Sequence, residues 1–168
     1  MSEFTRMIDV RQAEGKHAML EASAVERAAL AERFGIVSIH TFTADVVLRR
    51  NGRDVAADGS LAADIVQACA VSGEDLAVSV REQVALRFIP DDQLDQVHDE
   101  VELEADELDE IPYSGTQIDL GEALAQSLAL AIDPFITGPN ADEARKRSGI
   151  QIEAASGPFA ALAALKKE

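Results

Sequence analysis

The chain of 168 residues has a single cysteine, Cys69, a single tyrosine and no tryptophan. One cysteine cannot close a disulfide within the chain, and it cannot supply a structural zinc site built from four thiolates. So few aromatic rings leave little for stacking on nucleic-acid bases or for lining a small-molecule pocket. We therefore expect no cofactor, no small-molecule substrate and a core built mainly from aliphatic side chains.

Long apolar runs are also missing. The first twenty residues carry six Asp, Glu, Lys or Arg side chains, and no later stretch approaches the ~18 uncharged apolar residues that a membrane span requires. The sequence therefore predicts neither a signal peptide nor contact with a membrane. Together with the lone cysteine, it predicts a protein of the reducing cytoplasm.

Basic residues are scarce, with 15 Lys and Arg against 31 Asp and Glu, and the formal net charge is −16. This balance disfavours a general nucleic-acid binder, which needs Lys and Arg to offset phosphates. The segment 91–110 contains eleven of the acidic residues and no basic one, so much of the excess is local. The segment is either a mobile acidic loop or a strand that binds a partner, and a basic protein is the partner that its charge favours.

Motifs for catalysis are not found. The glycines do not reproduce the spacing of a nucleotide-binding loop, and the three histidines do not stand at the spacing of metal ligands. Cys69 falls within an apolar strand pattern, where a free cysteine is usually a small buried side chain. His98 and the carboxylates around it could hold a divalent cation, but acidic loops bind ions nonspecifically more often than they form a designed site. We expect no catalytic residue and no metal site.

The first half of the chain predicts one helix followed by strands. Ser23 and Glu26 form a capping box before a helix over residues 24–33, and Gly35 can end it in the left-handed conformation. β-branched residues predict a strand over 36–48. The turn chemistry of Asn51-Gly52 then places three arginines on an exposed loop.

A hairpin and further helices follow. Apolar arms over residues 61–71 and 76–89 flank a turn, and Pro90 ends the second arm. Asp119 can cap a helix over 120–131. A short charged turn of helix at 142–147 and an Ala/Leu helix after Pro158 complete the chain.

Together these elements predict an α+β fold. Its sheet is expected to be mostly antiparallel, or a partly open barrel, with an N-terminal helix and C-terminal helices packed on it. We expect a single domain over residues 1–168. Within it, the acidic segment 91–117 is expected to be mobile and the C-terminal segment 138–168 loosely held.

Charged clusters are the candidate interaction sites. The acidic cluster comprises Asp91, Asp92, Asp95, Asp99, Glu100, Glu102 and Glu104. The two basic clusters comprise Arg49, Arg50 and Arg53, and Arg145, Lys146 and Arg147. The basic clusters could contact phosphates or could be ordinary solubilising surface. The acidic cluster could attract a basic protein and raise the rate of encounter.

A series of short segments occurs in the order found in one known family. They are residues 21–22 with 26–31 (Glu-Arg-Ala-Ala-Leu-Ala), 59–69, 84–88 (Val-Ala-Leu-Arg-Phe), 118–122 (Ile-Asp-Leu-Gly-Glu), 128–135 and 158–162. Over about residues 1–165 the chain thereby resembles the YceD family, the large ribosomal RNA subunit accumulation proteins, in the form with a long N-terminal helix. Many members carry a second cysteine three positions after the one that matches Cys69, where this chain has Ser72, so no zinc or thiol role is expected here.

The resemblance implies a role in the accumulation or processing of large-subunit ribosomal RNA, and it implies no established active site. Three hypotheses follow. The first is a non-enzymatic factor that binds a basic ribosomal protein or an rRNA-processing protein through the acidic cluster. The second is direct binding of structured ribosomal RNA through the basic clusters. The third, a metal-dependent nuclease, is the weakest, because two-metal chemistry needs carboxylates held on rigid elements.

Overall fold

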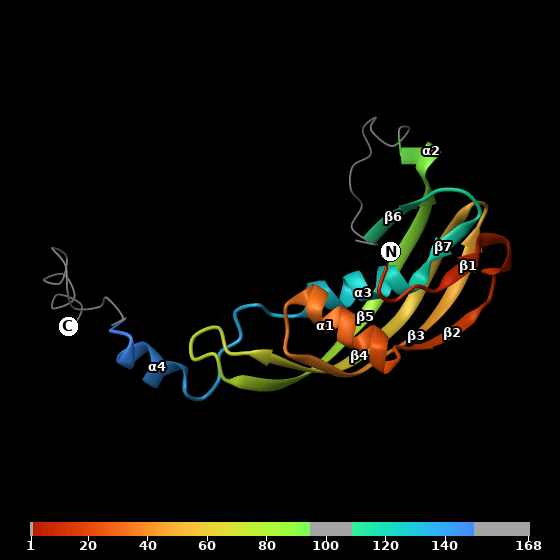
Figure 1. The fold of residues 1–168 in the computed structure, drawn as a ribbon. Helices are drawn as coiled ribbons and strands as arrows, with labels where there is room; N and C mark the ends of the chain where they lie inside the picture. The colour runs from red at the N-terminus through yellow and green to blue at the C-terminus, as the bar shows by residue number, and fades with distance from the viewer. Residues whose placement is uncertain (1, 95–108, 150–168) are drawn as a thin grey trace, which may run out of the picture. The chain divides into compact units, whose positions relative to one another are not determined.

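The computed structural model describes residues 2–94 and 109–149 (Figure 1). These residues form two compact units. One comprises the described parts of Met1–Gln67 and Asp75–Asp133, and the other comprises Ala68–Glu74 with the described residues after Asp133. The first unit contains nearly all of the secondary structure.

The first unit is built on a five-stranded sheet. Its strands are β2 (His17–Glu21), β3 (Ser38–Asn51), β4 (Asp54–Ala68), β5 (Asp75–Pro90) and β6 (Asp109–Tyr113), and they are hydrogen-bonded in the order β2-β3-β4-β5-β6. β3 is antiparallel to both β2 and β4, whereas β6 runs parallel to β5. A separate two-stranded antiparallel sheet joins β1 (Met7–Asp9) to β7 (Gln117–Asp119).

One face of the five-stranded sheet carries the core. Residues of β3 and β5 alternate between buried and more exposed positions over much of their length, and those of β4 alternate between buried and half-buried ones, as expected for a sheet whose core lies on one side. The helices α1 (Ala24–Phe34) and α3 (Leu120–Ala131) contact β3 and β5 respectively, and Figure 1 shows both on the same side of the sheet. Leu30 of α1 and Leu124 and Leu128 of α3 are completely buried there.

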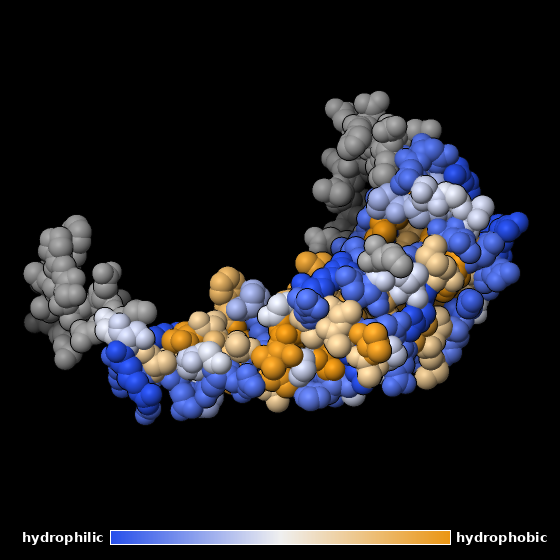
Figure 2. Space-filling view, viewed as in Figure 1, coloured by the Kyte–Doolittle hydropathy of each residue, from blue (hydrophilic) through white to orange (hydrophobic). Residues whose placement is uncertain are grey.

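The face of the molecule seen in Figure 2 is mostly hydrophilic, with smaller apolar patches between the hydrophilic residues. The opposite face of the sheet follows this pattern, because Thr43 and Asp45 of β3 are exposed while Phe42 and Val46 beside them are buried. No helix of the described part is long and apolar enough to span a membrane.

Local signals decide where both long helices begin and end. Ser23 and Glu26 form the predicted capping box, and Gly35 ends α1 with a φ of 66°. Asp119 caps α3 by accepting a hydrogen bond from the Glu122 amide at 3.1 Å. The predicted helices over 24–33 and 120–131 are therefore confirmed, the first with one further residue.

The predicted fold class is wrong in its overall architecture. The five-stranded sheet is mixed, because β6 pairs with β5 in parallel, and the described strands do not close into a barrel. β1, a 3₁₀ turn (Val10–Gln12) and β2 precede the first helix, which has eleven residues, so the chain does not start with a long helix. Residues 91–108 separate β5 from β6, which is the length of connection that a parallel pairing requires.

Other predicted segments have mixed outcomes. The span 91–117, predicted to be mobile, begins with α2 (Asp91–Leu94) and contains β6 and the first residue of β7, while its residues 95–108 lie outside the described part. The short helix predicted at 142–147 is present as α4 (Ala141–Arg147) in the second unit. The helix predicted after Pro158 lies outside the described residues.

Candidate interaction surface

The acidic segment 91–110, which contains the acidic cluster, is attached to the sheet at both of its ends. Asp91 and Asp92 form the start of α2, directly after β5, and Asp109 and Glu110 begin β6, which lies next to β5 (Figure 1). Five members of the acidic cluster, Asp95, Asp99, Glu100, Glu102 and Glu104, lie outside the described residues. The described carboxylates thus mark the edge of the sheet from which the segment leaves and to which it returns.

The structure brings one basic residue to this edge. Arg53, in the turn between β3 and β4, forms an ion pair with Asp92 at 2.8 Å, and Asp92 raises the pKa of the Arg53 guanidinium. The Tyr113 hydroxyl of β6 donates a hydrogen bond to the Arg53 carbonyl. Residues from the predicted acidic cluster and from one predicted basic cluster are therefore neighbours, although about forty positions separate them in sequence.

A second arginine holds the start of β6. The Arg87 guanidinium lies 2.7 Å from the Asp54 carboxylate and 3.3 Å from that of Glu110. Arg87 of β5 thereby connects Asp54 of β4 to Glu110 of β6 through two ion pairs. Sequence reasoning missed Arg87, because its role depends on strand neighbours that only the folded sheet defines.

The other arginines of the first basic cluster lie in β3, since the strand continues to Asn51 and leaves Gly52 and Arg53 as the turn. Arg49 forms an ion pair with Asp58 at 2.5 Å. The Arg50 amide donates to the Glu14 carboxylate at 2.8 Å, and its guanidinium donates to the Gly52 carbonyl at 2.9 Å.

The second basic cluster lies on α4 and is also largely paired. Arg145 bonds Asp142 at 2.8 Å, and Arg147 bonds Glu143 at 3.2 Å, the usual partners three and four positions away on a helix. Lys146 is exposed and forms no ion pair with a described residue. Four of the six predicted basic side chains thus form an ion pair with a carboxylate.

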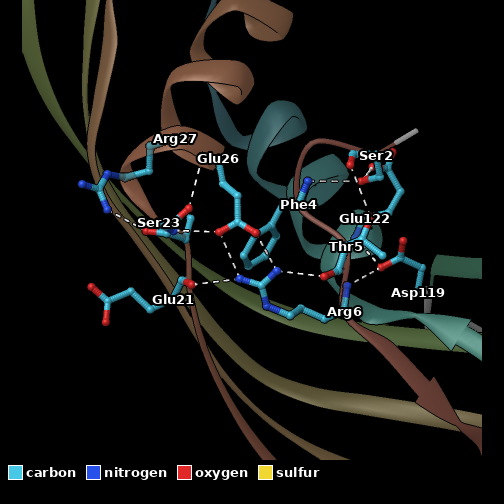
Figure 3. Close-up of polar contacts among 11 residues, drawn as sticks. Ser2, Phe4, Thr5, Arg6, Glu21, Ser23, Glu26, Arg27, Asp119 and Glu122 are labelled. Atoms are coloured by element: carbon cyan, nitrogen blue, oxygen red, sulfur yellow. Dashed lines mark hydrogen bonds and ion pairs between the residues drawn. The ribbon is translucent and has the colours of Figure 1, made fainter.

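An ion-pair network near the N-terminus was not predicted (Figure 3). Arg6 packs over the Phe4 ring at 4.3 Å, binds both carboxylate oxygens of Glu26, at 2.7 and 3.0 Å, and its amide donates to Asp119 at 2.9 Å. The Arg6 hydrogen bonds hold the pKa of Glu26 at about 2. This network connects the N-terminal segment to α1 and to the start of α3.

A second part of the network joins the two helices directly. Arg33 of α1 bonds Glu122 of α3 at 2.7 Å and Glu3 at 2.8 Å. The Arg33 guanidinium holds the pKa of Glu122 at about 2. Since every partner in the network is another residue of the same unit, its role is structural.

Cys69 is buried, as predicted, with 3 % of its surface exposed. Its Sγ accepts hydrogen bonds from the amides of Ser72 and Gly138, each at 3.3 Å. Hydrogen bonds from Ser72 and Gly138 lower the pKa of the thiol to about 6. In the described part of the chain, no three His, Cys, Asp or Glu side chains are placed as the ligands of one metal ion.

Comparison with known proteins identifies the family. The sequence model of the family described as large ribosomal RNA subunit accumulation protein YceD matches residues 57–166, well over half of the chain. Searches of curated proteins and of solved structures found no match to the chain. The matched region includes β5, the acidic segment, β6 and α3. The chain therefore belongs to the YceD family of large ribosomal RNA subunit accumulation proteins.

Proposed function

We propose that this protein is a non-enzymatic, cytoplasmic factor that supports the accumulation or processing of large-subunit ribosomal RNA by binding a basic ribosomal or rRNA-processing protein through residues 91–110. The family name supports the connection to ribosomal RNA. The charge of the segment supports a basic partner, because complementary charge accelerates encounter and discriminates against wrong partners.

The observation that carries this proposal is the contrast between paired cations and unpaired anions at the sheet edge. Arg53 and Arg87 are each bound to carboxylates of the same unit. Asp91 and Asp109, at the two ends of the acidic segment, form no ion pair with any described residue. The free charge at this edge is therefore negative, which attracts a cationic partner.

The same pairing argues against RNA as the direct ligand of the basic clusters. A phosphate would have to displace Asp58 from Arg49 or Asp92 from Arg53, and both contacts lie on a chain of net charge −16. Among the six basic residues, only the side chains of Arg50 and Lys146 form no ion pair with a described carboxylate, and they are the only support for direct RNA binding.

The test is capture of partners by the tagged full-length protein from cells, with and without nuclease. The informative variant replaces Glu100, Glu102 and Glu104 by Gln, which leaves Asp92 and Glu110 in their ion pairs. The matched control replaces three carboxylates outside the segment, as Glu21→Gln, Glu32→Gln and Asp75→Asn. An ion pair at a protein surface is worth ~0.2–1 kcal/mol, so the loss of three such pairs in the first variant should weaken the affinity for the partner about threefold to 150-fold.

Retention of a basic protein after nuclease treatment, with loss in the first variant and not in the control, is the expected result. Equal capture of the partner by the parent protein, the first variant and the control would refute a role for the acidic segment. Loss of every partner on nuclease treatment would instead favour RNA.

A further inference from the structure

Among the described residues, the strand β5 has a free edge. It contains 16 residues, but β6 pairs only with its last part, from Leu86 to Pro90 (Figure 1). On that side the residues of β5 before Leu86 have no strand neighbour in the part of the chain that the structure describes. Such an edge presents backbone N–H and C=O groups that an extended segment can pair with.

A groove follows this edge. It has a volume of about 240 Å³ and is lined by Glu82, Gln83, Val84, Ala85 and Leu86 of β5, by Asp109 of β6, and by Ser127, Leu130 and Ala131 of α3. Five consecutive residues point alternately to the two faces of a sheet, so a groove that touches all five runs along the backbone edge. Its volume is below the ~300–1,000 Å³ of ordinary small-molecule sites and suits a side chain of a docked peptide.

The groove combines an apolar wall with an acidic rim. Leu130 is 82 % exposed, and Ala131, the next residue of α3, also lines the groove. Glu82 and Asp109 form the acidic part, and neither is in an ion pair with a described residue. A Lys or Arg side chain satisfies both features, because its aliphatic stem can cover Leu130 while its cation meets one of the carboxylates.

Glu82 has a further consequence for specificity. It lies between Val80 and Val84 on the side of β5 that is otherwise apolar, and both of these valines are buried. A charged side chain on a free edge discourages indiscriminate strand pairing. It also disfavours a second copy of this acidic chain, while a basic strand compensates it.

We propose that an extended, basic segment of a protein partner adds as a strand to the free edge of β5 beside β6, with a Lys or Arg side chain in the groove between Glu82, Asp109 and Leu130. This inference rests on the proposed function and specifies how the basic partner is held. The acidic segment attracts the partner, and the β5 edge aligns it.

The probe is a fluorescein-labelled eight-residue peptide of alternating Lys and Val, measured by fluorescence anisotropy with the full-length protein. Two further peptides of the same sequence carry N-methyl groups either on all Val amides or on all Lys amides. Alternate amides of a strand point to the same side, so only one of these two peptides can lose its bonds to β5. Strand addition predicts that one loses about tenfold or more in affinity and the other loses little.

The side-chain contacts are tested by Glu82→Lys and Leu130→Ala, with Glu32→Lys as the control of equal charge change at an exposed site on α1. We expect about tenfold weaker peptide binding for Glu82→Lys, several-fold weaker for Leu130→Ala and less than twofold for the control. Both groove positions are exposed, so these variants should fold, which thermal melting verifies. Slower amide exchange at residues 79–85 on adding the peptide would locate it at the edge.

Equal binding of all three peptides would overturn the proposal, since attraction by net charge alone does not depend on which amides are methylated. Equal effects of Glu82→Lys and Glu32→Lys would overturn it as well. If partner capture from cells depends on Glu100, Glu102 and Glu104 but not on Glu82, the proposed function stands and this binding mode fails. If capture depends on neither, the proposed function fails, and the peptide measurements still decide whether the edge binds a basic strand.

Discussion

Gly121, in the first turn of α3, offers a test in which helix propensity and packing predict opposite signs. Alanine is a better helix former than glycine, so Gly121→Ala would by propensity alone stabilise the protein by ~1 kcal/mol. In the folded protein, however, a Cβ at this position would lie 2.3 Å from the Phe4 carbonyl oxygen and 2.8 Å from the Arg6 amide. Both contacts are with backbone, so the N-terminal segment would have to move.

The cost follows from what that segment does. Moving it threatens two hydrogen bonds, from the Leu120 amide to the Arg6 carbonyl at 3.0 Å and from the Arg6 amide to Asp119 at 2.9 Å. Each is worth ~1 kcal/mol, and overpacking adds ~1–3 kcal/mol. Phe4, which is 1 % exposed, would also shift. After the gain in propensity, we expect Gly121→Ala to lower the free energy of unfolding by about 2–4 kcal/mol.

The assay is thermal or urea unfolding followed by circular dichroism. For a chain of this length the loss corresponds to a decrease in Tm of about 4–16 °C. Leu130→Ala is the control, since it changes an exposed residue of the same helix and should alter the free energy of unfolding by less than about 0.5 kcal/mol. A Gly121→Ala protein as stable as the parent would refute the close packing of the N-terminal segment on α3.

Three further outcomes are expected. The pKa values of Glu26 and Glu122 are held at about 2, against 4.5 ordinarily, so their contribution to stability is complete above pH 4.5 and is lost as the pH falls toward 2. Urea unfolding from pH 7 to pH 2 should show this decline in the free energy of unfolding, and Glu26→Gln should make the decline smaller. Parallel plots of the free energy of unfolding against pH for the parent and Glu26→Gln would contradict the argument. The Cys69 thiol, with its pKa lowered to about 6, should give a thiolate absorbance near 240 nm that titrates near pH 6 in the native protein. Its burial should keep disulfide exchange with Ellman's reagent slow until the protein unfolds. Rapid reaction of the native protein would show that the side chain is accessible. Asp92→Asn should leave the urea midpoint nearly unchanged, because both side chains of the Arg53–Asp92 pair are more than half exposed, and a large shift would mean that the pair is structural.

Sequence reasoning worked where structure depends on neighbours along the chain. The ends of α1 and α3 follow from Ser23, Gly35 and Asp119, whose hydrogen bonds and backbone conformation are local. The β5 strand was predicted from its alternation and from Pro90, which closes it. The burial of Cys69 followed from the same kind of pattern.

It failed where structure depends on contacts across the chain. The pairing of Met7 with Asp119 that forms the two-stranded sheet joins short segments without a strong strand pattern. The parallel pairing of β6 with β5 has no local signature, because the two strands are separated by the acidic segment. Both errors led to the expectation of a mostly antiparallel sheet after an N-terminal helix.

The candidate site shows the same division. Composition alone located the acidic segment and the six basic residues, since charge can be counted in the sequence. The partners of Arg49 and Arg53 could not be counted, because Asp58 and Asp92 meet them only through the β3-β4 register and the return of β5 to the same edge. A basic cluster in an acidic protein therefore cannot be read as a phosphate site until its carboxylate neighbours are known.

The position of Asp109 connects the two parts of the proposed mechanism. Asp109 belongs to the acidic segment by sequence and begins β6 by backbone pairing with Leu86. It also lines the groove, as does Glu82. A cation drawn toward the segment by long-range attraction thus encounters, where the segment joins the sheet, the Asp109 carboxylate and, further along β5, that of Glu82. Backbone groups of β5 that have no strand neighbour among the described residues lie along the same edge. Attraction by net charge is nonspecific and weakens with salt, whereas backbone pairing along β5 requires an extended strand in one register. Adding salt should therefore slow association with the partner more than it accelerates dissociation, and the reverse division would mean that the acidic residues hold the partner after binding.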